Sequence, residues 1–179
     1  MDYPRLLPPD TEAVISTMMS DKRLQQFEEL GEIDFSYSIP QIGRYRVNVF
    51  HQRGSMAASI RLVSTKIPLP EELGIPKSVV DLYQKKRGLV LVTGPTGSGK
   101  STTLASIIDR INSMREVHVI TLEDPIEYLH NHKKAMVNQR EVGLDTHSYS
   151  NALRAALRED PDVILVGEMR DLETISTAI

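Results

Sequence analysis

The stretch GPTGSGKS, residues 94–101, has residue types and a spacing that could bind phosphate. Gly94, Gly99, Lys100 and Ser101 fit the pattern G-x-x-x-x-G-K-[ST], whose glycines let backbone N–H groups point at phosphate oxygens. We therefore expect ATP as the ligand, with Lys100 near its β- and γ-phosphates and the Ser101 hydroxyl on Mg²⁺. The residues expected to contact the nucleotide are Gly94, Pro95, Thr96, Gly97, Ser98, Gly99, Lys100, Ser101 and Thr102.

Hydrolysis of a bound nucleotide also needs an acidic side chain that orients or deprotonates the attacking water. Glu168 is the candidate, because it directly follows the apolar run VILVG and ligands bind at the carboxyl ends of parallel strands. Gly167 stands where this class of site often has an aspartate linked to Mg²⁺. The alternative for Glu168 is an ordinary solvated carboxylate at the end of a strand.

A second acidic stretch, TLEDPIEY, begins as the apolar run VHVIT ends. Glu123, Asp124 and Glu127 would repel one another unless a cation or an arginine lies beside them. We expect this stretch to supply the carboxylate that Gly167 cannot offer to Mg²⁺. A solvated acidic turn around Pro125 is the alternative.

The elements that must position these residues alternate between strand and helix in the second half of the chain. Continuous apolar runs at 89–93, 117–122 and 163–167 are typical of parallel strands buried on both faces. Helical stretches at 101–112 and 148–158 separate them, as in βαβ units. We therefore predict an α/β domain with a mostly parallel sheet, preceded by a helix over 76–86.

The first half of the chain has a different periodicity. Helices are expected over 11–19 and from Ser20 to a stop at Gly31. Three segments then alternate apolar and polar residues, as in an antiparallel sheet with one solvated face: IDFSYSIP, RYRVNVFHQ and SMAASIRLV. A stretch with three prolines predicts a linker over 67–76, between a domain over 1–66 and a domain over 77–179.

Composition excludes several classes of function. The chain of 179 residues has no cysteine, which rules out disulfides and thiolate metal sites. A net charge of −3 and an aromatic content of 5% do not indicate a nucleic-acid surface, and no run of roughly 18 apolar residues predicts a membrane span. His130 and His132 have a spacing found in metal sites but lack an evident third ligand, so we expect a solvated turn there.

Several stretches together resemble one family. GPTGSGKSTTLASIID, TLEDPIEYLH, VNQREVG and ALRAALREDPDVILVGEMRDLETI are similar to the type II/IV secretion ATPase superfamily. The motif GEMRD is more similar to that of the type IV pilus retraction branch, the PilT type of twitching motility protein. The assembly and type II secretion relatives tend to have GEIRD at this place. DFSYSIP and RYRVNVF are similar to the family's PAS-like N-terminal domain.

This resemblance implies a PAS-like α/β domain, a linker and a RecA-like P-loop ATPase core. It implies a subunit of a homohexameric ring that retracts a pilus, cytoplasmic and peripheral to the inner membrane, where a pilus platform protein would be its partner. By the same resemblance Glu168 is the catalytic base, Glu123 and Glu127 are functional carboxylates, and Arg46 and Arg61 reach the γ-phosphate. The family's core extends past DLETI and usually opens with a strand that MDYPRLL does not match, so the chain is expected to be truncated at both ends.

The sequence leaves alternatives open. The pilus assembly or type II secretion branch would use the same nucleotide chemistry for another task. A nucleotide-binding module without hydrolysis would fit Gly167 and the expected truncation; Glu168 argues against it for the complete protein, and less so for this chain alone. A nucleic-acid motor is disfavoured by the charge and the low aromatic content, and an ordinary strand surface is the alternative for Arg46 and Arg61.

Overall fold

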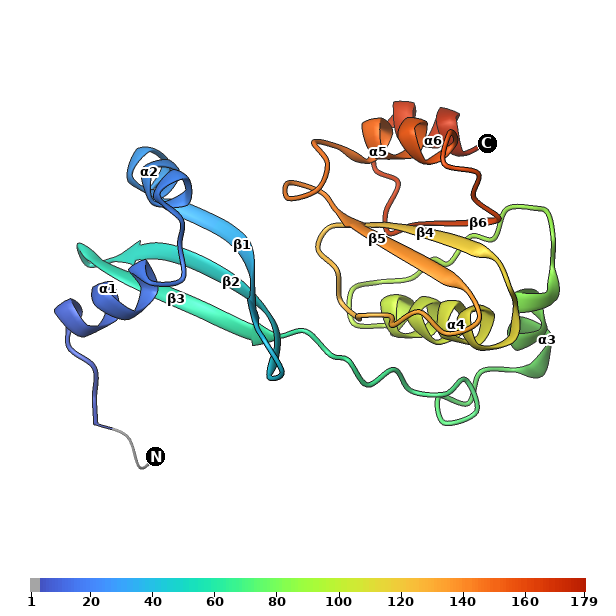
Figure 1. Cartoon of the computed structure of the whole chain (residues 1–179), viewed down its shortest axis with the longest axis horizontal. Coiled ribbons are helices and arrows are strands. Elements are labelled where there is room, and N and C mark those ends of the chain that lie inside the picture. The colour runs from blue at the N-terminus through green and yellow to red at the C-terminus, as the bar shows by residue number, and fades with distance from the viewer. Residues whose placement is uncertain (1–3) are drawn as a thin grey trace. The chain divides into compact units, whose positions relative to one another are not determined.

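The computed structural model describes residues 4–179, which divide into two compact units. The first unit ends at Val63 and the second begins at Ser64; Figure 1 colours them from blue to turquoise and from green to red. Residues 1–3 of the domain expected over 1–66 lie outside the described part. The linker expected over 67–76 belongs by its contacts to the second unit.

The first unit is a three-stranded antiparallel sheet with two helices on one face. Its elements are α1 (Pro8–Ser16), α2 (Asp21–Leu30), β1 (Glu32–Ile39), β2 (Gly43–Gln52) and β3 (Ser55–Leu62), with the strands in the order β1-β2-β3. The alternation of apolar and polar residues therefore predicted these strands correctly. Gly31 ends α2 in the left-handed conformation, with φ of 79°, as expected for a glycine stop.

Helix α1 begins at Pro8, three residues before the start predicted at Thr11. Proline is tolerated in the first turn of a helix, where its missing N–H has no partner to lose. The Asp10 carboxylate accepts a hydrogen bond from the Leu7 backbone N–H at 2.8 Å and stabilises this earlier start.

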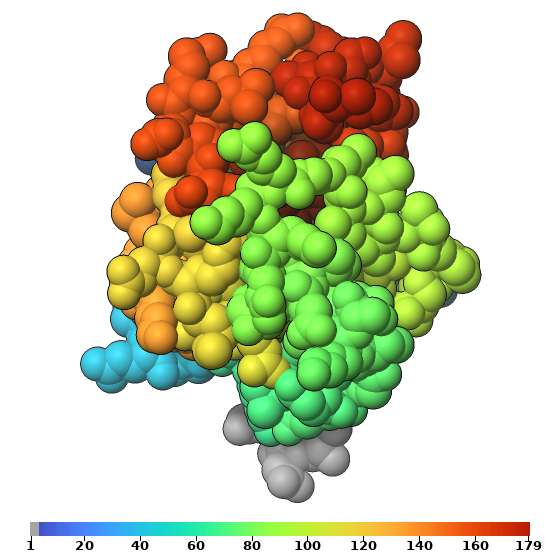
Figure 2. Space-filling model, turned by 90° about the vertical axis from the view of Figure 1, so that its right-hand side faces the viewer, coloured from blue at the N-terminus to red at the C-terminus, as the bar shows by residue number. Residues whose placement is uncertain are grey.

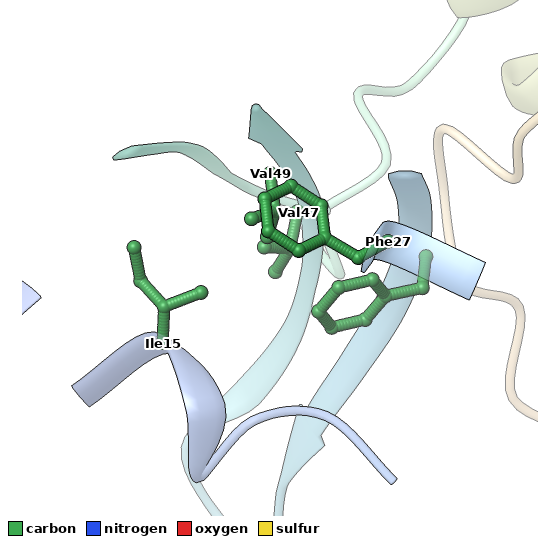
Figure 3. Close-up of a cluster of buried hydrophobic side chains, with 5 residues drawn as sticks. Ile15, Phe27, Val47 and Val49 are labelled. Carbon is green, nitrogen blue, oxygen red and sulfur yellow. The ribbon is translucent and has the colours of Figure 1, made fainter. Parts of the chain in front are cut away.

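The core of the first unit lies between the helices and one face of the sheet (Figure 3). Ile15 from α1 and Phe27 from α2 pack with Phe35 on β1 and with Val47 and Val49 on β2. Successive side chains of a strand point to opposite faces, so the even-numbered residues of β2 face away from this core.

The second unit is a parallel sheet with helices on both faces. Its elements are α3 (Lys77–Val80), the 3₁₀ helix η1 (Asp81–Gln84), α4 (Lys100–Met114), β4 (His118–Glu123), β5 (Met136–Glu141), α5 (Tyr149–Ala156), β6 (Val163–Val166) and α6 (Leu172–Ala178). The strands lie in the order β5-β4-β6 and run parallel. Helix α4 covers one face, and α5 and α6 lie on the other (Figure 1).

Strand β4 is buried on both faces, as its apolar sequence predicted. Val119 faces the cluster that contains Ile108 and Ile111 of α4, whereas Ile120 faces Ala152 and Leu153 of α5. The sheet is therefore the middle layer of three, and its carboxyl edge lies between the N-termini of helices on either side.

The predicted strand at 89–93 does not form. These residues pair with no strand of the described chain, and the Leu89, Val90 and Leu91 side chains are 55%, 54% and 61% exposed. Figure 2 shows the green segment of this part of the chain at the surface of the second unit. An apolar run becomes a strand only when a neighbouring strand supplies its hydrogen bonds, and β6 is bonded only to β4.

Two further departures concern local patterns. The helix expected over 76–86 is a single α-helical turn followed by the 3₁₀ helix η1. Strand β5 was not predicted, because its sequence MVNQRE lacks an apolar run and it is held by pairing with β4 along its whole length.

Candidate nucleotide-binding and hydrolytic site

A cleft of about 630 Å³ lies at the carboxyl edge of the parallel sheet. It is lined by the P-loop and the start of α4, by the acidic stretch after β4, and by the residues that follow β6. Among the residues expected from the sequence, the cleft brings together Thr96, Gly97, Gly99, Lys100, Ser101, Thr102, Glu123, Glu127 and Glu168. Gly94, Pro95 and Ser98 belong to the same loop but do not line the cleft.

The P-loop needs glycine where its backbone turns sharply. Gly94 has φ of 153°, and a Cβ there would lie 2.8 Å from the Ser98 Oγ. Gly99 is the N-cap of α4 and has φ of 89°, in the left-handed region. A non-glycine residue at either position would strain the backbone. The turn that these glycines permit places the free N–H groups of the α4 N-terminus at the cleft.

Lys100 lies within the P-loop itself. Its Nζ donates hydrogen bonds to the carbonyl oxygens of Gly94 and Pro95, both at 2.9 Å. These bonds hold the positive charge at the mouth of the nest of backbone N–H groups. The Lys100 ammonium and these N–H groups would together attract an anionic phosphate.

Thr102 is connected to the acidic stretch by a hydrogen bond between hydroxyl groups. Its Oγ1 lies 3.1 Å from the hydroxyl of Tyr128, across 26 positions of sequence. This bond joins the first turn of α4 to the loop after β4, so it links the P-loop side of the cleft directly to the acidic side.

Glu123 is a carboxylate held in an unfavourable environment. Its Oε1 accepts hydrogen bonds from Thr121 Oγ1 at 2.6 Å and from Gln139 Nε2 at 3.1 Å. Burial nevertheless raises the pKa of Glu123, and the neighbouring charge of Glu127 raises it further. A cation beside the two carboxylates would remove this penalty.

Glu168 lies two residues beyond the end of β6 and faces the same cleft. Its Oε2 is 2.9 Å from Arg170 Nη2, but the Arg170 side chain is 81% exposed, and so open an ion pair is weak. The Gly167 backbone N–H donates to the Leu122 carbonyl at 2.7 Å, which keeps Glu168 beside the end of β4. Chain register, and not sequence proximity, thus brings the two acidic stretches together.

The donor atoms of the cleft suit Mg²⁺ only with help from a ligand. Among residues 4–179, no group of three or more His, Cys, Asp or Glu side chains could hold a metal ion. Mg²⁺ typically takes one or two carboxylates together with substrate phosphates and water. The Ser101 hydroxyl and the Glu123 and Glu127 carboxylates fit that mode, since all are oxygen ligands lining one cleft.

Arg46 and Arg61 belong to the first unit, where the structure brings them together. They are paired directly across β2 and β3, and both are exposed. Arg46 Nε lies 3.9 Å from Asp34 Oδ1, a loose and solvated ion pair. Like charges directly opposite each other destabilise a sheet, so this pair is a feature that an anion would stabilise.

The solvated turn expected at His130 and His132 is wrong for His130, whose side chain is buried, whereas His132 is exposed as expected. The His130 side chain is 3% exposed and lines the cleft, and the His132 Nδ1 accepts a hydrogen bond from the Val137 backbone N–H at 3.0 Å. The His130 backbone N–H also donates to Gln139 Oε1 at 2.8 Å. These contacts come from the folding of the segment onto α4 and β5, which no local pattern reveals.

Tyr128, Tyr149 and Arg170 also line the cleft and were not singled out from the sequence. A lone tyrosine on a helix or after a strand is usually an ordinary core residue, so its type gives no signal. Tyr149 could have been found only from its place at the start of the helix that precedes the Glu168 strand.

Comparison with known proteins places these features in a family. The sequence profile described as type II/IV secretion system protein matches residues 53–179. A Pseudomonas aeruginosa protein named type IV pilus retraction ATPase PilT is 51% identical over 179 residues, which are 100% of this chain and 52% of that protein. A Neisseria gonorrhoeae twitching motility protein is 45% identical over 179 residues, 100% of this chain and 48% of its own length. The chain therefore spans about half the length of these curated relatives.

Solved structures agree with the sequence comparison. A crystal structure of the pilus retraction motor PilT with bound ADP has a TM-score of 0.94 and 59% identity, covering 98% of this chain and 51% of that one. The Legionella pneumophila ATPase DotB has a TM-score of 0.81 and 34% identity, with 98% and 51% covered. The α/β fold expected from sequence is confirmed, and among residues 4–179 no helix has both the length and the apolar character to cross a membrane. By its sequence profile and its fold, the chain belongs to the type II/IV secretion system protein family.

Proposed function

We propose that this chain is the nucleotide-binding part of an ATP-hydrolysing motor subunit that powers type IV pilus retraction. The observation that carries the proposal is the cleft in which the P-loop residues meet Glu123, Glu127 and Glu168. Sequence similarity to a pilus retraction ATPase over the whole chain supports retraction as the task.

The residues of the P-loop bind the triphosphate. Backbone N–H groups at the start of α4 donate to phosphate oxygens, and Lys100 neutralises charge at the β- and γ-phosphates. To do so, Lys100 exchanges its bonds to the Gly94 and Pro95 carbonyls for bonds to phosphate. Ser101 holds Mg²⁺ through its hydroxyl, and Thr102 lies near the α-phosphate.

The acidic residues act on the water. Glu168 orients the attacking water and accepts its proton, while Glu123 and Glu127 hold the metal and its water shell in place. Mg²⁺, when bound, neutralises charge that develops on the phosphate oxygens. Most of the catalysis is therefore positioning and electrostatics, which suits a site built from three separate segments of one sheet edge.

Arg46 and Arg61 supply further positive charge to the γ-phosphate. Their pairing across β2 and β3 gives two guanidinium groups on one exposed face, which suits bidentate contact with phosphate. The subunit acts in a homohexameric ring, so each nucleotide can receive these arginines from the ring. The ring works in the cytoplasm at the inner membrane, against a pilus platform protein.

The type II secretion branch is the second candidate function. Its members named type II secretion system protein E match less of the chain, for example 49% identity over 102 residues in the Aeromonas hydrophila protein. The retraction relatives match all 179 residues, including the N-terminal unit. A retraction motor predicts cells that keep surface pili but lose twitching when the gene is removed; loss of the pili themselves would favour assembly.

Nucleotide binding can be tested on the chain itself. Thermal unfolding with Mg-ATP at roughly 100 times its Kd should show about 2.7 kcal/mol of added stability, and Lys100→Ala should abolish that gain. In the complete protein, Glu168→Gln should keep binding and lose phosphate release. A nucleotide-binding module without hydrolysis would instead show no phosphate release in the parent.

A further inference from the structure

Gly167 is pressed against its surroundings at the edge that carries Glu168. A Cβ at this position would lie 3.1 Å from the Leu122 carbonyl oxygen, 3.3 Å from the Tyr149 hydroxyl and 3.4 Å from the Glu123 Cα. The first two distances are tighter than ordinary contact, and the Leu122 oxygen is backbone that cannot swing aside. A side chain at position 167 would therefore have to push its neighbours aside by a few tenths of an ångström, and one of these neighbours is the Tyr149 hydroxyl.

The Tyr149 ring is anchored, which fixes where its hydroxyl points. Tyr149 is the first residue of α5, and the side chain of Ser148 caps that helix by accepting a hydrogen bond from the Asn151 N–H at 3.2 Å. The ring packs against the cluster that contains Ile120 and Leu122 of β4. Its hydroxyl end reaches the same cleft as Glu168.

Negative charge surrounds this hydroxyl. Burial raises the pKa of Tyr149 well above its usual range, and the charges of Glu168, Asp124 and Glu123 raise it further, against a smaller opposite effect of Arg170. Tyr149 therefore stays protonated, as a hydrogen-bond donor among acceptors. Glu168 is the carboxylate with the largest influence on it.

We propose that Tyr149 is a positioning residue, whose hydroxyl donates a hydrogen bond to the Glu168 carboxylate and holds it toward the attacking water. The inference rests on the proposed hydrolytic role of Glu168. The other partner of Glu168 is Arg170, whose side chain is 81% exposed and is not anchored by a core. The Tyr149 hydroxyl lies beside position 167 on a ring held by the core, so it would supply an ordered contact once the Glu168 side chain turns from Arg170 into the cleft.

Tyr149→Phe removes the hydroxyl and keeps the ring, so the packing of α5 on β4 is retained. Carbon-13 NMR titration of the Glu168 carboxylate in this chain, without nucleotide, should show a higher pKa in Tyr149→Phe, because a hydrogen bond to the charged form lowers the pKa. In the complete protein, kcat should fall by about 10- to 100-fold, the value of a hydrogen bond to a charged group, with the KM for ATP unchanged. The acid limb of the pH–rate profile should move to higher pH together with the pKa of Glu168.

Tyr83→Phe is the matched control. Tyr83 lies in η1 and packs against the α4 face of the sheet, away from the cleft, so it should leave the Glu168 pKa and kcat as in the parent. An unchanged Glu168 pKa in Tyr149→Phe would overturn the proposal whether or not ATP is hydrolysed. So would a rise in KM that matches the fall in kcat/KM, which indicates a general loosening of the site. A parent protein that binds ATP but does not hydrolyse it would contradict the proposed function and not the role of Tyr149. In that case the NMR titration would still show whether Tyr149 donates a hydrogen bond to Glu168.

Discussion

At the scale of single residues, burial opposes the negative charge of the Glu123 carboxylate. The hydrogen bonds from Thr121 and Gln139 hold the carboxylate in place but do not restore its ordinary pKa of 4.5. The folded state thus binds the Glu123 proton more tightly than the unfolded state does. The stability that this gives is present below about pH 4.5 and is lost as the pH rises through the raised pKa, at about 1.4 kcal/mol for each pKa unit.

Glu123→Gln should therefore raise the thermal stability of the nucleotide-free chain at about pH 8 and change it little near pH 4. Glutamine keeps the oxygen that accepts both hydrogen bonds and removes the buried charge. Thermal unfolding of parent and variant across this pH range measures the difference. The same variant should lose part of the stabilisation by Mg-ATP, and equal pH dependence in the two proteins would contradict the assignment.

His130 gives the opposite pH dependence. Burial lowers its pKa from 6.5, and Lys133 lowers it further, although the nearby Asp109 acts in the other direction. The unfolded chain therefore takes up a proton that the folded chain resists. Stability is fully present above about pH 6.5 and falls as the pH drops from there toward the lowered pKa.

His130→Gln should reduce the loss of stability between about pH 7 and pH 5, because no buried imidazole then resists protonation. Urea unfolding at several pH values measures it. His147→Gln is the control, since His147 is exposed. If the pH dependence of the free energy of unfolding is unchanged in His130→Gln, or changes as much in His147→Gln, another group causes the loss of stability at acidic pH.

At the scale of elements, α5 connects the core to the sheet edge that carries Glu168. It packs on β4 and β6, and its first residue is Tyr149. Its start is fixed by the Ser148 cap, so a local hydrogen bond sets the position of a side chain in the cleft. The segment at 89–93 shows the converse, because its strand-like sequence forms no strand without hydrogen-bonded neighbours.

Ser148→Ala should destabilise the second unit by about 1 kcal/mol, the usual cost of losing an N-cap. The free N–H of Asn151 would lose its acceptor, and α5 would fray at the end that carries Tyr149. Urea unfolding measures the change, and Ser148→Asp should restore most of the stability because aspartate also caps helices well. Equal losses in both variants would show that the hydroxyl has a different role.

At the scale of the whole molecule, two units with separate cores share one chain. The Phe27 cluster is confined to the first unit, and the clusters on the two faces of β4 are confined to the second. Units with separate cores need not unfold in one transition. Nucleotide contacts of the P-loop depend on the second unit, so a lesion in the first core should leave them intact.

Phe27→Ala should destabilise the first unit by about 3–5 kcal/mol, the usual cost of removing a buried phenylalanine side chain. Hydrogen exchange resolved by segment should show lost protection in β1 and β2, with β4 protected and its stabilisation by Mg-ATP retained. Ile108→Ala in the α4 face of the second core should give the reverse pattern. Equal loss of protection in both units in either variant would mean that they fold as one.

The sequence by itself determined the features whose cause is local. The P-loop could be predicted because eight consecutive residues carry both the sharp turns and the charge, and β1–β3 because the alternation of side chains directly reflects a half-buried sheet. The tertiary structure decided what depends on partners far along the chain. Strand β5 exists because β4 pairs with it, and the 89–93 run is not a strand because nothing in the described chain pairs with it. The Tyr149 hydroxyl lies against Gly167 because two strands and a helix pack together, and that packing is set by contacts between residues that no local pattern connects.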